Sequence, residues 1–169
     1  MTRRRRHPSL IPLSHQHRDA LMLAFRLRHP APPGPVTPMT PASTPQSRAA
    51  DTLDFFSRHL VGHFRAEEEA LFPLLRERLS GDTPRLALLD QLIADHRCLE
   101  SLRDGVAAAT DAGEAGLAAP LTAFADLLEA HVRREERELF EAVPDLLAPG
   151  DAERLESAIR RALGRHAER

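Results

Sequence analysis

The sequence predicts an all-α protein, an antiparallel four-helix bundle followed by a short C-terminal helix. Apolar residues recur with the helical period in four long segments, and no segment shows the strict alternation that predicts a β-strand. Turn-forming residues separate these segments closely, except for one proline-rich stretch after the first. A chain of 169 residues suffices for one domain with a substantial core.

The N-terminal part is predicted to contain a basic arm, a first helix and a linker. The arm comprises residues 1–9, and the first helix begins near Pro12 or Ser14, because a serine can cap it and proline suits its first turn. Residues 30–47 are so rich in proline that neither a helix nor a packed strand can persist there. We therefore expect an extended linker over this stretch.

The second helix is predicted from Arg48 or Asp51 to Leu79. Pro73 lies inside it and removes one backbone hydrogen bond, so we expect a bend near residues 71–72. The later predicted elements are a third helix over residues 84–110, a turn over 111–116, a fourth helix from Leu117 or Pro120 to Val143, and a last helix within 148–169 that Asp151 caps.

The composition disfavours several classes of function. The formal net charge is −2, so we do not expect a nucleic-acid partner; the run Arg3–Arg6 is interpreted as a solvated tail, with a tether for an anionic partner as the alternative. Cys98 is the only cysteine, which excludes an intramolecular disulfide and thiolate metal clusters. No apolar run could serve as an export signal or a membrane span, so we expect a cytoplasmic protein without a membrane partner. The oligomeric state stays open.

One ten-residue pattern occurs twice, in the second and fourth predicted helices. Residues 63–72 read HFRAEEEALF and residues 131–140 read HVRREERELF, so both follow the pattern H-x-R-x-E-E-x-x-L-F. The His and the first Glu are four residues apart and share a helix face, and that face belongs to the apolar stripe. The preceding helix of each half also carries an inward His, namely His17 and His96.

Two helical hairpins face to face would thus bring six polar side chains to one level of the core. They are His17, His63, Glu67, His96, His131 and Glu135. A single inward His is commonly satisfied by a hydrogen bond, but burying all six without a cation is costly. Imidazole and carboxylate ligands without thiolate suit iron or manganese, and zinc tolerates them. Six ligands suit two metals about 3.5–4 Å apart, with the two Glu bridging and two His terminating at each metal.

This arrangement resembles the hemerythrin-like HHE cation-binding family over residues 10–147. The resemblance rests on the paired motifs and on the segments LSHQH, which ends at His17, and ADH, which ends at His96. It implies a hemerythrin-like four-helix bundle with two Fe ions in an oxo- and carboxylate-bridged di-iron centre. It further implies binding or sensing of O2, NO or iron, or a role in iron–sulfur repair and in oxidative or nitrosative stress.

The sequence departs from the oxygen-carrying members of that family at one position. Those proteins use a fifth His on the third helix, whereas Leu92 and Glu100 stand four residues from His96 here. His59, one turn before His63, and Glu100 are therefore weaker candidates for additional ligands. The missing His disfavours reversible oxygen carriage, because a carboxylate-rich site is better suited to activating oxygen.

Several further interpretations concern residues outside the six. Glu68 and Glu136 turn away from the ligand face by about 100° and are expected at the surface, paired with Arg65 or Arg133. Cys98 is expected to be a small buried side chain, with a redox sensor as the alternative. For the whole protein, binding or sensing is favoured. The alternatives are a di-iron redox enzyme acting on O2, peroxide or NO, and a metal-free helical interaction module.

Overall fold

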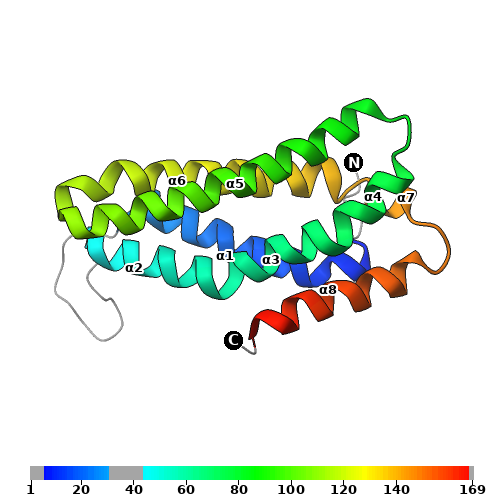
Figure 1. Ribbon diagram of the computed structural model, residues 1–169, viewed down its shortest axis with the longest axis horizontal. Coiled ribbons are helices and arrows are strands. Elements are labelled where there is room, and N and C mark those ends of the chain that lie inside the picture. The colour runs from blue at the N-terminus through cyan, green and yellow to red at the C-terminus, as the bar shows by residue number, and fades with distance from the viewer. Residues whose placement is uncertain (1–5, 31–43, 168–169) are drawn as a thin grey trace.

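The computed structural model describes residues 6–30 and 44–167, and over these residues the protein is a helical bundle with no strand (Figure 1). Its elements in chain order are η1 (Pro8–Leu10), α1 (Ile11–Arg28), α2 (Pro45–Phe55), η2 (Phe56–Leu60), α3 (Val61–Ala66), η3 (Glu67–Leu71), α4 (Phe72–Arg78), α5 (Thr83–Ala112), α6 (Glu114–Arg134), η4 (Glu135–Leu139), α7 (Val143–Leu146) and α8 (Asp151–Ala167). The predicted all-α fold is confirmed.

Four long helical stretches form the bundle and a fifth covers one side. α5 and α6 lie side by side, α1 packs against α6, and α2 contacts both α5 and α6 (Figure 1). α8 lies along α3 and also contacts η1 and η3. Two separate apolar clusters fill the interior, one including Phe56 and Phe124 and the other including Leu13 and Phe72.

Caps and glycine explain where the helices begin and end. α2 begins at Pro45, earlier than predicted, because the Thr44 hydroxyl accepts a 3.1 Å hydrogen bond from the Ser47 N–H. The predicted turn over residues 111–116 is too broad, since Gly113 alone separates α5 from α6. Its φ of 96° lies in the left-handed region that favours glycine, so one residue reverses the chain.

Both repeats contain a π-helical turn at the same place. η3 and η4 each begin at the first Glu of the motif, and the N–H groups of Phe72 and Phe140 bond to carbonyls five residues earlier. Pro73 follows η3, but Glu141 stands at the matching position after η4. The irregularity therefore accompanies the repeated motif and does not require the proline. The continuous fourth helix predicted to Val143 is wrong, because regular α-helix ends at Arg134.

Several expectations about the ends of the chain are changed or lie beyond the structure. The arm is not wholly loose, because Ser9 and Leu10 are buried in η1. Residues 1–5, and with them Arg3 to Arg5, lie outside the described residues, as do linker residues 31–43. Asp151 begins α8 fully buried, where its carboxylate accepts hydrogen bonds from Arg78 and from the Ala148 N–H. No described helix combines the length and apolarity that a bilayer crossing requires.

Candidate metal centre

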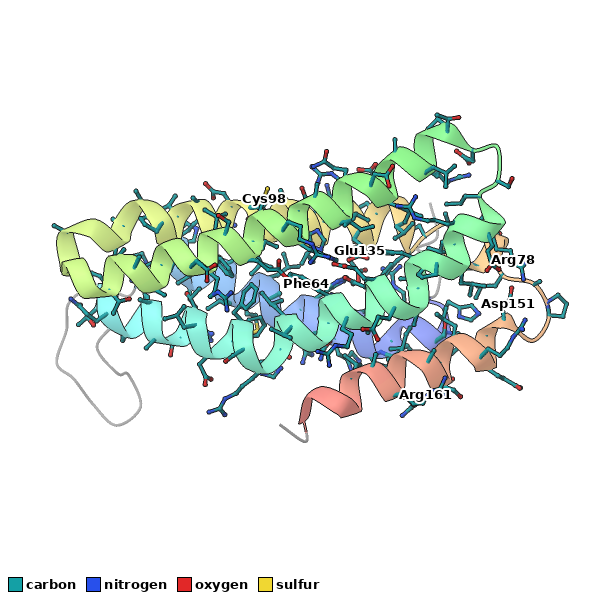
Figure 2. The ribbon with its side chains drawn as sticks, in the orientation of Figure 1. Phe64, Arg78, Cys98, Glu135, Asp151 and Arg161 are labelled. Carbon is teal, nitrogen blue, oxygen red and sulfur yellow. The ribbon has the colours of Figure 1, made fainter. Side chains whose placement is uncertain are left out.

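The six predicted polar residues converge inside the bundle, where Figure 2 shows Glu135 pointing into the space between the helices. Each comes from a different element, and each is at most 2% exposed. They are His17 on α1, His63 on α3, Glu67 at the start of η3, His96 on α5, His131 on α6 and Glu135 at the start of η4. The bundle thus has a buried polar layer where a helical core is ordinarily apolar.

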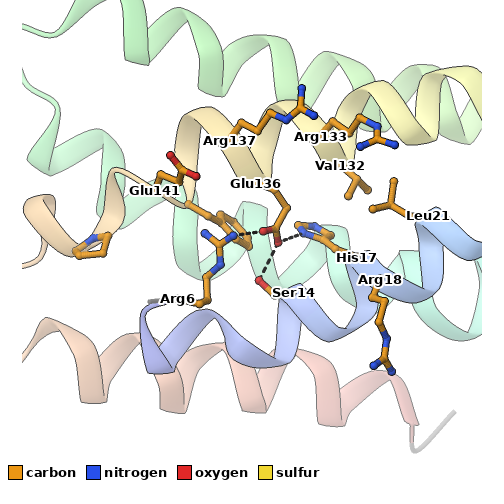
Figure 3. A pocket seen from close by; sticks show the side chains of 12 residues that line it. Arg6, Ser14, His17, Arg18, Leu21, Val132, Arg133, Glu136, Arg137 and Glu141 are labelled. Atoms are coloured by element: carbon orange, nitrogen blue, oxygen red, sulfur yellow. Dashed lines mark hydrogen bonds and ion pairs between the residues drawn. The ribbon is translucent and has the colours of Figure 1, made fainter. Parts of the chain in front are cut away.

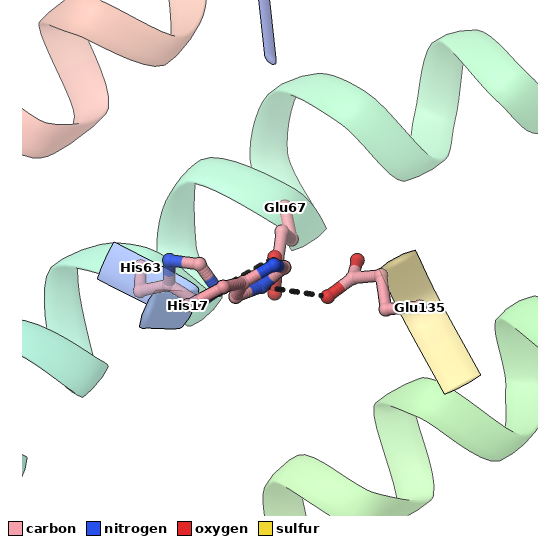
Figure 4. Close-up of side chains that lie close together, drawn as sticks. All are labelled: His17, His63, Glu67 and Glu135. Atoms are coloured by element: carbon pink, nitrogen blue, oxygen red, sulfur yellow. Dashed lines mark hydrogen bonds and ion pairs between the residues drawn. The ribbon is translucent and has the colours of Figure 1, made fainter. Parts of the chain in front are cut away.

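One group of four side chains gathers around His17 (Figure 4). The Nε2 atoms of His17 and His63 lie 2.9 Å apart. Glu67 Oε1 is 2.8 Å from His63 Nε2, and Glu135 Oε2 is 3.1 Å from His17 Nε2. One ligand atom from each of these residues lies within 4.8 Å of the others, so a single cation could contact them all.

A second group consists of Glu67, His96 and His131. His96 Nε2 lies 3.2 Å from Glu67 Oε2, which is the carboxylate oxygen that the first group does not use. Glu135 Oε2, already close to His17, is 3.7 Å from His131 Nε2. Glu67 thus divides its two oxygens between the groups, and Glu135 presents one oxygen toward both.

A second layer of polar groups holds the imidazoles by their outer nitrogens. The Nδ1 atoms of His17 and His96 are each 2.8 Å from a carboxylate oxygen, of Glu136 and Glu68 respectively. His63 Nδ1 is 2.9 Å from Gln16 Oε1. Because these oxygens only accept, each Nδ1 carries a hydrogen, and in a neutral imidazole the Nε2 then turns its lone pair inward. Such outer acceptors fix the orientation of metal-binding imidazoles.

The fourth imidazole, His131, is held less closely. Its Nδ1 lies 3.6 Å from Asp95 Oδ2, beyond hydrogen-bonding distance. Asp95 in turn accepts hydrogen bonds from Gln91 and Arg134.

These outer residues were not predicted as part of the site, and the prediction that Glu68 and Glu136 pair with Arg65 or Arg133 at the surface is wrong. Glu68 and Glu136 contact the histidines of the site, because a carboxylate one position past the inner Glu reaches sideways to the neighbouring helix. Arg65 and Arg133 pair instead with Glu69 and Glu129.

The repeat itself carried the missing signal. Gln16 and Asp95 occupy matching positions, each directly before the inward His on the first helix of its half. The second Glu of each motif also matches, since Glu68 contacts His96 and Glu136 contacts His17.

The inner atoms fit a cation better than they fit one another. With neutral imidazoles, both carboxylate oxygens of Glu67 and Glu135 and the Nε2 atoms of His96 and His131 are buried without a hydrogen-bond partner. Imidazole lone pairs directed at carboxylate oxygens repel unless a positive charge lies between them. Two metal ions would supply that charge and use the oxygen and nitrogen donors that iron accepts.

Without metal, bound protons supply the positive charge between the imidazoles and the carboxylates. Burial opposes charge on His17, but hydrogen bonds with Glu135, Glu136 and Glu67 outweigh it and raise its pKa well above the ordinary value. The same balance raises the pKa of His96 to about 9. Burial lowers the pKa of His63, while the surrounding imidazoles, chiefly His63, outweigh burial and hold the pKa of Glu67 well below the usual range. Metal ions and protons thus compete for the same inner nitrogen and oxygen atoms.

The remaining candidates lie outside this layer. His59 is exposed and packs its ring near Phe55, and the Glu100 carboxylate is 42% exposed and bonds to Arg97. Neither takes part in the two groups, so we leave both out of the ligand set. Leu92, at the position of the missing fifth His, is fully buried in the core. Cys98 is exposed, so the expectation of a buried thiol is wrong.

A helical bundle with adjoining groups of buried His and Glu belongs to the class of carboxylate-containing metal-binding bundles. The sequence model of the hemerythrin HHE cation-binding domain matches residues 12–143, so the chain belongs to this family. Membership implies that it binds a metal cation, iron. No curated protein and no solved structure matched the chain in the corresponding searches.

Proposed function

We propose that the protein is a non-haem di-iron protein that binds or senses O2, NO or iron. The observation that carries the proposal is the division of the Glu67 carboxylate, with Oε1 toward His63 and Oε2 toward His96. One metal needs no such arrangement, whereas a carboxylate that bridges two metals presents one oxygen to each.

In this proposal, His17 and His63 would hold one iron and His96 and His131 the other, with the carboxylates of Glu67 and Glu135 available to both. The irons would supply the electrons for chemistry with O2 or NO. The chain contributes imidazoles oriented by Glu136, Gln16 and Glu68, and apolar clusters on either side exclude water from the layer.

A di-iron redox enzyme acting on O2, peroxide or NO is the second candidate. The site has Leu92 where a fifth imidazole would stand, so two carboxylates share the centre with only four histidines. A higher proportion of carboxylate stabilises oxidised iron and favours its oxidation over reversible binding.

The test is anaerobic purification, metal analysis, and stopped-flow absorption after mixing with O2 and with NO. We expect about two irons per chain. A stable adduct supports binding or sensing, and conversion to a diferric product with turnover supports the enzyme. Recovery of one zinc, or of no metal, from iron-replete cells would contradict both.

A further inference from the structure

A pocket of about 780 Å³ opens beside His17, between α1 and the segment formed by α6 and η4 (Figure 3). Its apolar part includes Leu21, Val132 and Phe140, and four arginines line it: Arg6, Arg18, Arg133 and Arg137. The volume lies within the range of small-molecule sites. The pocket is on the outer side of His17, away from the layer between the helices.

The space arises from a difference between the repeats. Phe64, second in the first motif, stacks on His96 with ring centroids 3.9 Å apart. Val132 has the same place in the second motif and lines the pocket. The smaller side chain leaves space beside His17 on the side where a phenyl ring covers His96, although His17 itself stays buried with Phe140 stacked 5.2 Å away.

The positive charge also distinguishes this side. Arg137 occupies the position in the second motif that Glu69 holds in the first. Arg18 follows His17 directly, just as Arg97 follows His96 in the other half. Arg97 is engaged by Glu68 and Glu100. On the pocket side Arg6 donates to Glu136 instead, so Arg18 keeps only a 3.7 Å contact with its neighbour Asp19 among the described residues.

Counting the arginines and carboxylates of the lining gives a net positive pocket. The four arginines face two carboxylates, Glu136 and Glu141, so 4 − 2 leaves two positive charges. Glu136 already accepts hydrogen bonds from Arg6, Ser14 and His17. The guanidinium of Arg137, exposed and without an ion pair in the described part of the chain, is thus available to an anion.

We propose that this pocket binds a small organic carboxylate with an apolar body. The carboxylate pairs with Arg137 at the rim, since guanidinium binds carboxylate through two parallel hydrogen bonds. Arg18, which Figure 3 shows on the opposite side of the pocket, adds only to its positive charge. The apolar body lies against Leu21, Val132 and Phe140. The proposal does not rest on the metal, because none of these residues belongs to the two ligand groups.

The test is isothermal titration calorimetry of the purified full chain with benzoate and with benzamide, its uncharged analogue. We expect benzoate to bind and benzamide to bind at least about tenfold more weakly, because it lacks the charge that the arginines recognise. Acetate, which has the charge without the ring, should also bind more weakly. Equal binding of benzoate and benzamide, or no binding of benzoate, would overturn the proposal.

Two substitutions locate the binding. Arg137→Gln should weaken benzoate binding about tenfold, the effect of losing one charged donor, and Val132→Phe should abolish it by filling the pocket. Arg161→Gln on α8 is the matched control, because it removes the same charge from an exposed position outside the pocket, and it should leave binding unchanged.

Circular dichroism checks the folding of each variant, and Arg137→Gln decides the matter if Val132→Phe does not fold. Benzoate affinity that Arg137→Gln leaves unchanged would place the carboxylate elsewhere, including on a bound metal, and would overturn the proposal. Benzoate binding by a protein found to contain no metal would support the pocket while contradicting the di-iron centre, so the two proposals can fail separately.

Discussion

The two halves of the molecule present the same inner groups but different surroundings. His17 and His96 correspond, since each is the inward His of its half, and both receive a hydrogen-bonded carboxylate from the opposite half. His63 and His131 correspond as the first residues of the motifs, and each faces the residue that precedes the inward His of its own half. The inner layer is therefore close to a twofold repeat.

The surroundings break this symmetry in packing and in charge. His96 is fully buried with Phe64 stacked on one face, whereas His17 has Val132 and an open pocket nearby. Gln16, a neutral amide, holds His63, whereas Asp95, a carboxylate, faces His131. The residues common to both repeats therefore build the buried layer of His and Glu, and the residues that differ between the repeats decide on which side a pocket opens.

We expect the largest effect when each inner carboxylate is removed in turn, which tests whether Glu67 and Glu135 are equivalent. Glu67→Ala removes the oxygens facing both groups, so we expect almost complete loss of metal; Glu135→Ala removes one shared oxygen and should retain more. Melting temperatures should fall in the same order, because each site saturated at about 100-fold metal excess over Kd contributes about 2.7 kcal/mol. Metal analysis and thermal melts measure this. Glu138→Ala, an exposed carboxylate in η4, is the control. Unchanged metal and melting in both variants would refute the proposed ligand set.

The next prediction concerns the metal-free protein and pH. The pKa of His96 is raised from 6.5 to about 9 by hydrogen bonds with Glu67 and Glu68 that outweigh burial. The stabilisation is fully present below pH 6.5 and is lost as pH rises through about 9. At about 1.4 kcal/mol per pKa unit, the difference between 6.5 and about 9 limits the loss to about 3.5 kcal/mol. Melts of chelator-treated protein across this window should show it, and His96→Gln should remove it. Rising stability over this window would contradict the prediction.

Exchanging the residues that differ in packing sharpens the comparison further. Phe64→Val should create a cavity beside His96 and lower the free energy of unfolding by about 2 kcal/mol, because a buried phenyl ring loses its contacts. Chemical denaturation measures the loss. Leu21→Val, at a half-buried position on the rim of the pocket, is the comparison and should cost less. Equal losses in the two variants would mean that the two sides are packed alike.

The smallest expected effect concerns the outer carboxylates. Glu68→Gln and Glu136→Gln keep the shape but weaken the acceptor for His96 Nδ1 and His17 Nδ1, so metal affinity should fall about tenfold in each. Competition with a chelator measures the affinity. Glu138→Gln again provides the control. If metal affinity fell in only one of these two variants, the outer carboxylates would support metal binding in only one half of the molecule.

Much of the fold followed from periodicity, and the errors have local causes. The apolar stripes predicted the helices because burial against neighbours requires one apolar face. The turn before α6 was placed too broadly because propensity does not reveal that Gly113 can reverse the chain alone. The π turns were missed because they change the hydrogen-bond register without changing the residue pattern that sequence analysis reads.

The inner residues of the site could be predicted from spacing along single helices, whereas the contacts of the outer residues could not. His63 and Glu67 share a helix face, which is a property of one helix and can be read from spacing. The contacts of Glu136 with His17 and of Glu68 with His96 join residues from opposite halves. No spacing along one helix encodes such a contact, because it depends on how deeply and at what angle two helices pack.

By itself, the sequence determined that two helical hairpins would each carry an inward His and an inward His-x-x-x-Glu, because side-chain direction follows from helical geometry. Tertiary structure alone decided that Glu67 faces two groups of histidines and that a pocket opens at His17 and not at His96. Those features arise from the space left between packed helices. That space depends on every side chain that fills it, including the exchange of Phe64 for Val132 between the repeats.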